Sequence, residues 1–160
     1  MTSLLFFLAA LAGSQPDGVR AEVTLGDRGA SIVSADPDGN VVIGGRGDDD
    51  VRVEGALNRV DGGGGRDRIH FGRRTGQLHL AAAVRGARSV LLIDAPFSID
   101  DLKLTYLSGA LYIELPPGDS GPASTAIVYG VGQGAPAVSS VRVGGRTFSI
   151  GQLRARAPRP

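Results

Sequence analysis

The sequence predicts an all-β fold in which short parallel strands wind into a coil and β-hairpins cover one end of it. Glycine contributes 25 of the 160 residues, and the acidic residues comprise 13 Asp and only 3 Glu. Gly and Asp belong to turns, whereas Glu is the better helix former, which argues against a helix bundle. The glycines lack the three-residue period of collagen, and a hydrophobic content of 42% is too high for a disordered chain.

Charge and cysteine content limit the partners that the sequence supports. The formal net charge is +1, so no broad electrostatic argument favours a nucleic-acid partner or a membrane surface. Cysteine is absent, which excludes a disulfide framework and a thiolate metal site. Any metal must therefore be held by oxygen or imidazole ligands.

Residues 1–21 form a hydrophobic N-terminal segment whose role the sequence leaves undecided. The apolar run from Leu4 to Ala12 is too short to span a bilayer as a helix, so we expect no membrane span. Its length suits a secretory signal, with small residues for cleavage before Gly13 or near Ala21, but a basic leading region is missing. Three interpretations stay open: a cleaved signal, a buried strand, and the cut end of a longer protein.

A nine-residue period runs through residues 26–79. When this part is aligned in six rows of nine, the eighth place of every row is aliphatic: Val33, Val42, Val51, Val60, Ile69 and Leu78. A unit this short fits a turn of about six residues and a three-residue strand whose middle side chain points inward. Successive strands then wind into a parallel coil around one aliphatic stack.

Two of the rows carry a fuller motif. Residues 44–52 read GGRGDDDVR and residues 62–70 read GGGGRDRIH, and both fit G-G-x-G-x-D-x-U-x, where U is aliphatic. This motif resembles the calcium-binding nonapeptide of RTX proteins, the haemolysin-type repeat family of secreted bacterial toxins, proteases, lipases and alginate epimerases. The resemblance implies a short parallel β-roll over residues 26–79, calcium as the bound ion, and a secreted, extracellular protein.

The residue chemistry agrees with a calcium site shared by two turns. Glycines at places one, two and four permit positive φ and bare backbone carbonyls, and the Asp adds formal charge. Calcium takes six to eight oxygen ligands at about 2.3–2.6 Å, more than one such turn supplies. If each row is half a coil, rows 18 residues apart stack. The expected ligands are the carboxylates of Asp49 and Asp67 and carbonyls near Gly45, Gly47, Gly63 and Gly65.

On the opposite side of the coil we expect a weak calcium site or none. There the row of residues 35–43 stacks on the row of residues 53–61, and Asn40 and Asn58 occupy the Asp place. An amide oxygen can ligate calcium but brings no charge. Arg46 and Arg66 lie in the two glycine-rich turns, where their positive charge lowers the affinity for a cation.

Residues 80–153 predict a β-rich cap, and residues 154–160 a basic tail. The segments 93–120 and 138–153 resemble the haemolysin-type calcium-binding related domain. Independently, the alternating residues around Ser108 and Gly109 predict a hairpin, and Gly144 and Gly145 suit a second one with a type I′ turn. A further strand is expected from Ser124, and these strands would cover the end of the coil.

The sequence thus leaves three functions open. The first is a noncatalytic extracellular module that is ordered by calcium, because unscreened carboxylates and glycine-rich turns disfavour the metal-free form. The second is the C-terminal part of a secreted protease, lipase, epimerase or toxin, whose partners would be a catalytic domain or an extracellular polymer. The third is a structural or adhesive coil with vestigial calcium sites.

Overall fold

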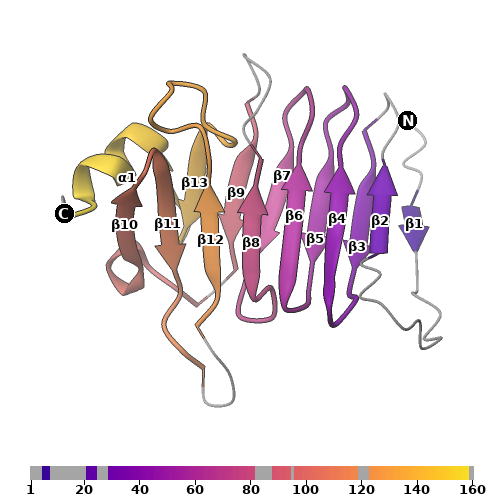
Figure 1. Ribbon diagram of the computed structural model, residues 1–160, viewed down its shortest axis with the longest axis horizontal. Coiled ribbons are helices and arrows are strands. Elements are labelled where there is room, and N and C mark those ends of the chain that lie inside the picture. The colour runs from indigo at the N-terminus through magenta and orange to yellow at the C-terminus, as the bar shows by residue number, and fades with distance from the viewer. Residues whose placement is uncertain are drawn as a thin grey trace.

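The computed structural model describes residues 5–7, 21–24, 29–81, 88–94, 96–118 and 123–158. Within these residues the fold is mostly β, with two largely parallel sheets of seven strands each (Figure 1). The expectation of an all-β chain is corrected by the 3₁₀ turn η1 (Ile99–Asp101) and by the C-terminal helix α1 (Ile150–Arg156).

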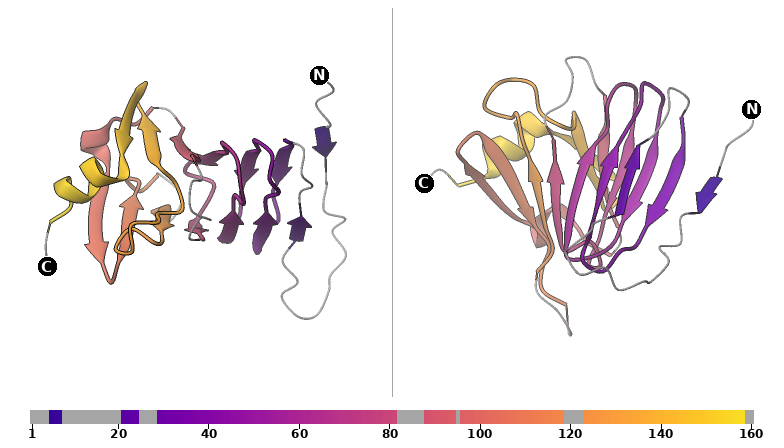
Figure 2. Two further views of the ribbon diagram at one scale, coloured as in Figure 1. Left: turned by 90° about the horizontal axis from the view of Figure 1, so that it is seen from above. Right: turned by 45° about the vertical axis from the view of Figure 1, so that its right-hand side comes forward.

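Strands of odd and even number separate into the two sheets as far as β9. One sheet has the order β1 (Leu5–Phe7), β3 (Ser31–Ser34), β5 (Asp50–Val53), β7 (Arg68–Phe71), β9 (Val90–Ile93), β13 (Ser140–Val143) and β14 (Arg146–Ser149). The other has the order β10 (Lys103–Leu107), β11 (Ala110–Glu114), β12 (Thr125–Val128), β8 (Gln77–Leu80), β6 (Leu57–Asp61), β4 (Gly39–Ile43) and β2 (Ala21–Thr24). The chain therefore alternates between the sheets, which face each other in Figure 2. We call one strand from each sheet, with its connections, a coil.

The core lies between the sheets and follows the nine-residue period with one exception. Five of the six predicted inward residues are at most 1% exposed: Val42, Val51, Val60, Ile69 and Leu78. Val33 was predicted wrongly, because it is 42% exposed and Ile32 occupies the inward place at 3%. Ser31 is the register partner of Asp50, 19 residues later, so the coil from β3 to β5 has one residue more than the period allows.

The strands of the repeat region, β3 to β8, are also longer than the predicted three residues. β5 has four residues and buries both Val51 and Val53, and β7 likewise buries Ile69 and Phe71. Each of these strands thus places two apolar side chains in the core where the nine-residue period predicts one.

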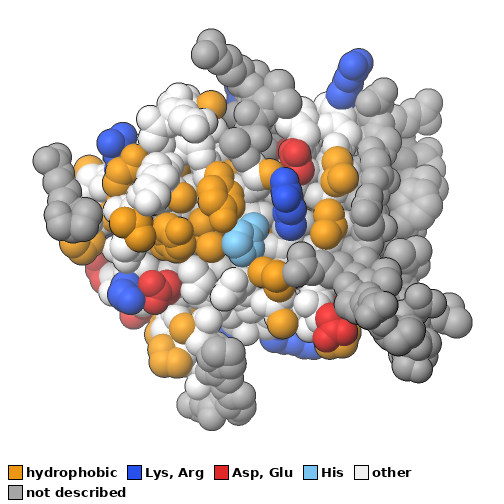
Figure 3. Space-filling model, in the orientation of Figure 1, with side chains coloured by type: hydrophobic (Ala, Val, Ile, Leu, Met, Phe, Trp, Pro, Cys, Tyr) orange, Lys and Arg blue, Asp and Glu red, His pale blue; other side chains and the backbone are white. Residues whose placement is uncertain are grey.

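Side chains also pack against one another on the outward face of the sheet that contains β8, β12 and β11. Figure 3 shows hydrophobic side chains gathered on this face beside a histidine. In the strand register His79 lies beside Ile127, which in turn lies beside Tyr112. The His79 and Tyr129 rings stack with centroids 5.9 Å apart, and His79 Nδ1 lies 2.9 Å from the Tyr129 hydroxyl. This face is accordingly a mixed aromatic and aliphatic surface.

Both predicted hairpins are confirmed. β10 and β11 pair antiparallel around Ser108 and Gly109, which have φ values of 51° and 82°. β13 and β14 pair antiparallel around Gly144 and Gly145, at 55° and 76°. Positive φ at both central residues is what a type I′ turn requires. The strand expected from Ser124 is β12, which joins the first hairpin to β8.

Helix α1 closes the C-terminal end of the two sheets. Its cap residue Ser149 accepts a hydrogen bond from the Gln152 amide, and the Gln152 side chain accepts one from the Ser149 amide. Ile150 and Leu153 are buried, and the helix contacts β10 and β14, one edge strand from each sheet. The helix crosses the boundary at 153 and 154 that separated the predicted cap from the predicted tail.

The interpretations of residues 1–21 fall largely outside the described residues. Only β1 and the first residue of β2 belong to that segment, and β1 pairs with β3. In the part of the chain that the structure describes, no helix has the length and apolar character needed to cross a bilayer.

Candidate metal centre

The two glycine-rich turns stack on each other. Residues 44–49 connect β4 to β5, and residues 62–67 connect β6 to β7. Because β5 and β7 are neighbours in one sheet, Asp49 and Asp67 occupy the same place in successive coils. Their side chains are buried, at 2% and 1% exposure. The structure thus brings together the two carboxylates that the 18-residue spacing predicts to be neighbours.

Hydrogen bonds link these carboxylates to the flanking coils. Asp49 Oδ1 accepts a hydrogen bond of 2.9 Å from the Ala30 amide, and Asp67 Oδ1 accepts one of 3.1 Å from the Asp49 amide. Asp67 Oδ2 accepts one of 2.7 Å from the Ser89 hydroxyl. Three of the four carboxylate oxygens are therefore engaged.

Asp49 Oδ2 is the exception. Among the described residues it is the buried side-chain oxygen or nitrogen that has no hydrogen-bond partner. An unpaired buried carboxylate oxygen is unfavourable, because the low dielectric of the interior does not replace the water it has lost. This atom marks the point of the site at which a ligand of positive charge would be most stabilising.

Glycine at the first place of each turn makes room for the carboxylates. A Cβ on Gly44 would collide with the carbonyl oxygen of Gly62 and would lie 3.1 Å from Asp49 Oδ2. A Cβ on Gly62 would collide with Asp67 Oδ2. The carbonyl of Gly62 and the unpartnered oxygen of Asp49 thus border one small space that any side chain at Gly44 would fill.

The four predicted glycine carbonyl positions divide between the two turns. Gly63 and Gly65 adopt positive φ values of 70° and 103°, and the carbonyl oxygens of Gly45 and Gly47 face them from the turn below. Gly45 O also accepts a hydrogen bond of 2.8 Å from the Gly64 amide. Gly65 O accepts one of 3.1 Å from the Arg88 amide, which directs it to the following coil.

Burial dominates the electrostatics of the two carboxylates. Desolvation raises the pKa of Asp49, with smaller raising effects from the Asp67 and Asp48 carboxylates, while the Ala30 and Gly45 amides oppose the rise. Desolvation likewise raises the pKa of Asp67, against the hydrogen bonds from Ser89 and the Asp49 amide. The fold therefore holds two carboxyl groups where the charged form is disfavoured.

The donor set fits a hard cation. Carboxylate and carbonyl oxygens are the ligands that calcium takes, and glycine-rich turns present both. Among the described residues, no group of three or more His, Asp or Glu side chains converges as a metal site, between these turns or elsewhere, so backbone carbonyls would have to supply most of the ligands here. Asp48 and Asp61 add charge at the rim, where Asp48 Oδ1 accepts a hydrogen bond from the Arg66 amide and Asp61 Oδ1 one from the Gly63 amide.

The Asn40 and Asn58 side chains form a ladder on the opposite side of the coil. Both are fully buried. Asn40 Nδ2 donates hydrogen bonds of 2.6 Å to Asn58 Oδ1 and to the Glu54 carbonyl, and Asn58 Nδ2 donates one to the Thr75 carbonyl. Asn40 Oδ1 in turn accepts from the Ser34 hydroxyl. The amide oxygens thus already have donors, which leaves this side less suited to a cation.

Ser89 and Ala30 supply the remaining hydrogen bonds to the Asp49 and Asp67 carboxylates. The nine-residue period does not predict either residue. Ser89 lies 22 residues after Asp67 and Ala30 lies 19 before Asp49, so neither falls on the 18-residue spacing. The signal available for Ser89 was its place directly before the apolar strand β9. The chain matches no protein-family model and no curated protein.

Proposed function

We propose that the chain is a noncatalytic calcium-binding module, in which a short parallel β-roll is followed by a hairpin-rich cap and the turns 44–49 and 62–67 share one ion. The observation that carries the proposal is the buried Asp49 Oδ2, which has no hydrogen-bond partner and lies one coil from Asp67. A divalent cation is the ligand that compensates two neighbouring buried carboxylates most directly.

The residues of the two turns have different roles in holding the ion. Asp49 and Asp67 would supply charge, and the carbonyl oxygens of Gly45 and Gly47, which face the turn of residues 62–67, would supply neutral ligands. When bound, calcium supplies the positive charge that the buried carboxylates lack. The chain contributes preformed turns, since the strands on either side fix the positions of both aspartates.

An extracellular setting follows from the same proposal. Extracellular calcium modules bind in the range of about 10⁻⁴–10⁻³ M, and the positive side chains of Arg46 and Arg66 in the turns favour the weak end of that range. The resemblance of the two motif rows to the RTX nonapeptide supports secretion. Binding at such concentrations would stabilise the folded chain by mass action.

Calcium titration by calorimetry, after treatment of the full chain with a chelator, tests the proposal. We expect one saturable binding event that disappears in the Asp49→Asn, Asp67→Asn double variant. The matched control is Asp36→Asn with Asp38→Asn, which removes the same charge from the exposed turn before β4. A wild-type chain without saturable binding, or an undiminished response in the Asp49 and Asp67 variant, would overturn the site.

A structural coil without calcium is the second candidate, and the Asn40–Asn58 ladder favours it. These amides join coils with no ion, and Asp67 accepts hydrogen bonds at both oxygens. On this alternative the melting temperature in chelator equals that in millimolar calcium. That the chain is the C-terminal part of a secreted enzyme or toxin stays a prediction, which the reading frame upstream of Met1 tests.

A further inference from the structure

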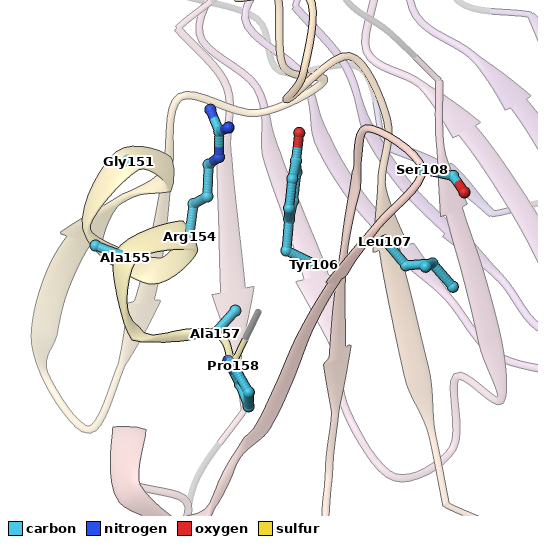
Figure 4. Close-up of a pocket in the computed structure, with 8 residues that line it drawn as sticks. All are labelled: Tyr106, Leu107, Ser108, Gly151, Arg154, Ala155, Ala157 and Pro158. Carbon is cyan, nitrogen blue, oxygen red and sulfur yellow. The ribbon is translucent and has the colours of Figure 1, made fainter. Parts of the chain in front are cut away.

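A groove lies at the capped end of the molecule, between the β10–β11 hairpin and helix α1 (Figure 4). Its volume is about 700 Å³, and it is lined by Tyr106, Leu107, Ser108, Gly151, Arg154, Ala155, Ala157 and Pro158. None of these residues belongs to the glycine-rich turns. The volume falls in the range of roughly 300–1,000 Å³ that small-molecule sites occupy.

Arg154 is the charged residue of this lining, and an aromatic ring holds it in place. Its guanidinium carbon lies 4.5 Å from the centroid of the Tyr106 ring, and the two side chains lie side by side in Figure 4. Stacking uses the face of the guanidinium and leaves the N–H groups at its edge able to donate. These donors suit the two oxygens of a carboxylate.

Among the described residues, no carboxylate pairs with the Arg154 guanidinium. Arg154 forms no ion pair within the described part of the chain, whereas its neighbour Arg156 lies 3.5 Å from Asp100. The sequence from residue 120 to residue 160 contains five arginines and no acidic residue. The lining of the groove therefore carries one positive charge and no negative one, which favours an anion from outside the chain.

The rest of the lining is apolar or small. Leu107 is 50% exposed, and Ala155, Ala157 and Pro158 add aliphatic surface. A polyanion would call for a row of cations along the groove, which has one. We propose that the groove binds a small amphipathic organic acid, whose carboxylate pairs with Arg154 and whose apolar body covers Tyr106 and Leu107.

Titration of the full chain with sodium octanoate, followed by amide chemical shifts of α1 and β10, tests this site. Octanol offers a similar apolar body without charge, and acetate offers the charge without the body. We expect saturable shifts at Tyr106 and Arg154 with octanoate, at a concentration at least about tenfold lower than for either comparator. Equal binding of octanol would overturn the role of the charge.

Two variants separate the charge from the shape of the groove. Arg154→Gln should weaken octanoate binding at least about tenfold, while Arg142→Gln, an exposed arginine on β13, should leave it unchanged. Gly151→Leu should also weaken it, because a Cβ there meets only Ser149 Oγ at 3.9 Å and the longer side chain can enter the groove without backbone strain. Unchanged binding in Arg154→Gln or Gly151→Leu would overturn the proposal, whatever the calcium result.

Discussion

The backbone amide of Asp49 donates a hydrogen bond of 3.1 Å to Oδ1 of Asp67 in the following coil. This contact binds one acidic turn to the next through the main chain, so the two carboxylates stay close although their charges repel. It satisfies Asp67 but does nothing for Asp49 Oδ2, which remains buried without a partner. Without a cation, the two buried carboxylates therefore repel each other with no positive charge between them.

Asp49 and Asp67 should contribute stability to the metal-free chain on acidification, against a smaller opposite contribution from the exposed Asp101, whose pKa is lowered by hydrogen bonds from Ser98. In the folded chain the pKa values of Asp49 and Asp67 are raised above the ordinary value of 3.8, so the folded state binds protons more tightly than the unfolded state. Stability from these groups must then rise as pH falls through their raised pKa values and level off below the ordinary one. Urea denaturation in chelator, from about pH 7 to about pH 4, measures this slope.

The Asp49→Asn, Asp67→Asn double variant is the control for that slope. It has no titrating group at either position, so its free energy of unfolding should rise less over the same pH interval. Calcium should reverse the wild-type trend, because protons compete with the ion for the carboxylates. Superimposable profiles of the two proteins in chelator would contradict the prediction.

Two glycines of the stacked turns should differ in their tolerance of alanine. Gly44→Ala places a Cβ against the Gly62 carbonyl, part of the main chain of the next turn, and should destabilise the chain by about 1–3 kcal/mol. Gly64→Ala meets Arg46 Cα at 3.6 Å, an ordinary contact, and should change stability by no more than about 0.5 kcal/mol. Denaturant unfolding of the pair measures the difference, and equal losses would show that the turns do not stack as described.

The amide ladder should stabilise the coil with or without calcium. Asn58→Ala removes the donor to the Thr75 and Gly55 carbonyls and the acceptor for Asn40 Nδ2, leaving buried groups unpaired at a cost of at least about 2 kcal/mol. Gln77→Ala, at an exposed site on β8, is the control. Melting curves in chelator and in calcium should show the same loss for Asn58→Ala, and a loss confined to one condition would count against a metal-independent ladder.

Helix α1 should depend on its cap. Ser149→Ala removes the hydroxyl oxygen that accepts a hydrogen bond from the Gln152 amide, and it should destabilise the chain by about 1 kcal/mol. Thr147→Ala, exposed two residues earlier on β14, serves as the control. Amide hydrogen exchange in α1 reports whether the helix itself loosens, and unchanged exchange at Leu153 would mean that packing alone holds the helix.

The sequence predicts the parts of the fold that local chemistry determines. Inward places must be aliphatic, so the period finds Val42 through Leu78, and paired glycines find the β13–β14 turn. It misplaces Val33 because a fixed period cannot show where one extra residue enters a coil. Helix α1 was missed, although Ser149 and Gln152 carry the spacing of a capping box.

The sequence predicts the pair of aspartates in the candidate site but not the residues that hydrogen-bond to them. The 18-residue spacing is enough to pair Asp49 with Asp67, since it fixes which strands are neighbours. The roles of Ala30 and Ser89 depend on coils of 19 and 22 residues, whose lengths no repeat specifies. The Asn ladder could be placed but not interpreted, because an amide serves equally as a ligand or as a hydrogen-bond donor.

The 18-residue unit that brings Asp49 under Asp67 also sets how the molecule could grow. Inserting further copies of residues 44–61 would extend both sheets without disturbing the cap, since stacked units contact only their neighbours. Each copy would also bury another carboxylate. Repeat proteins ordinarily become more stable as units are added, but here the gain per unit would be offset by a growing column of negative charge. Elongation would thus make the chain steadily more dependent on a counter-ion.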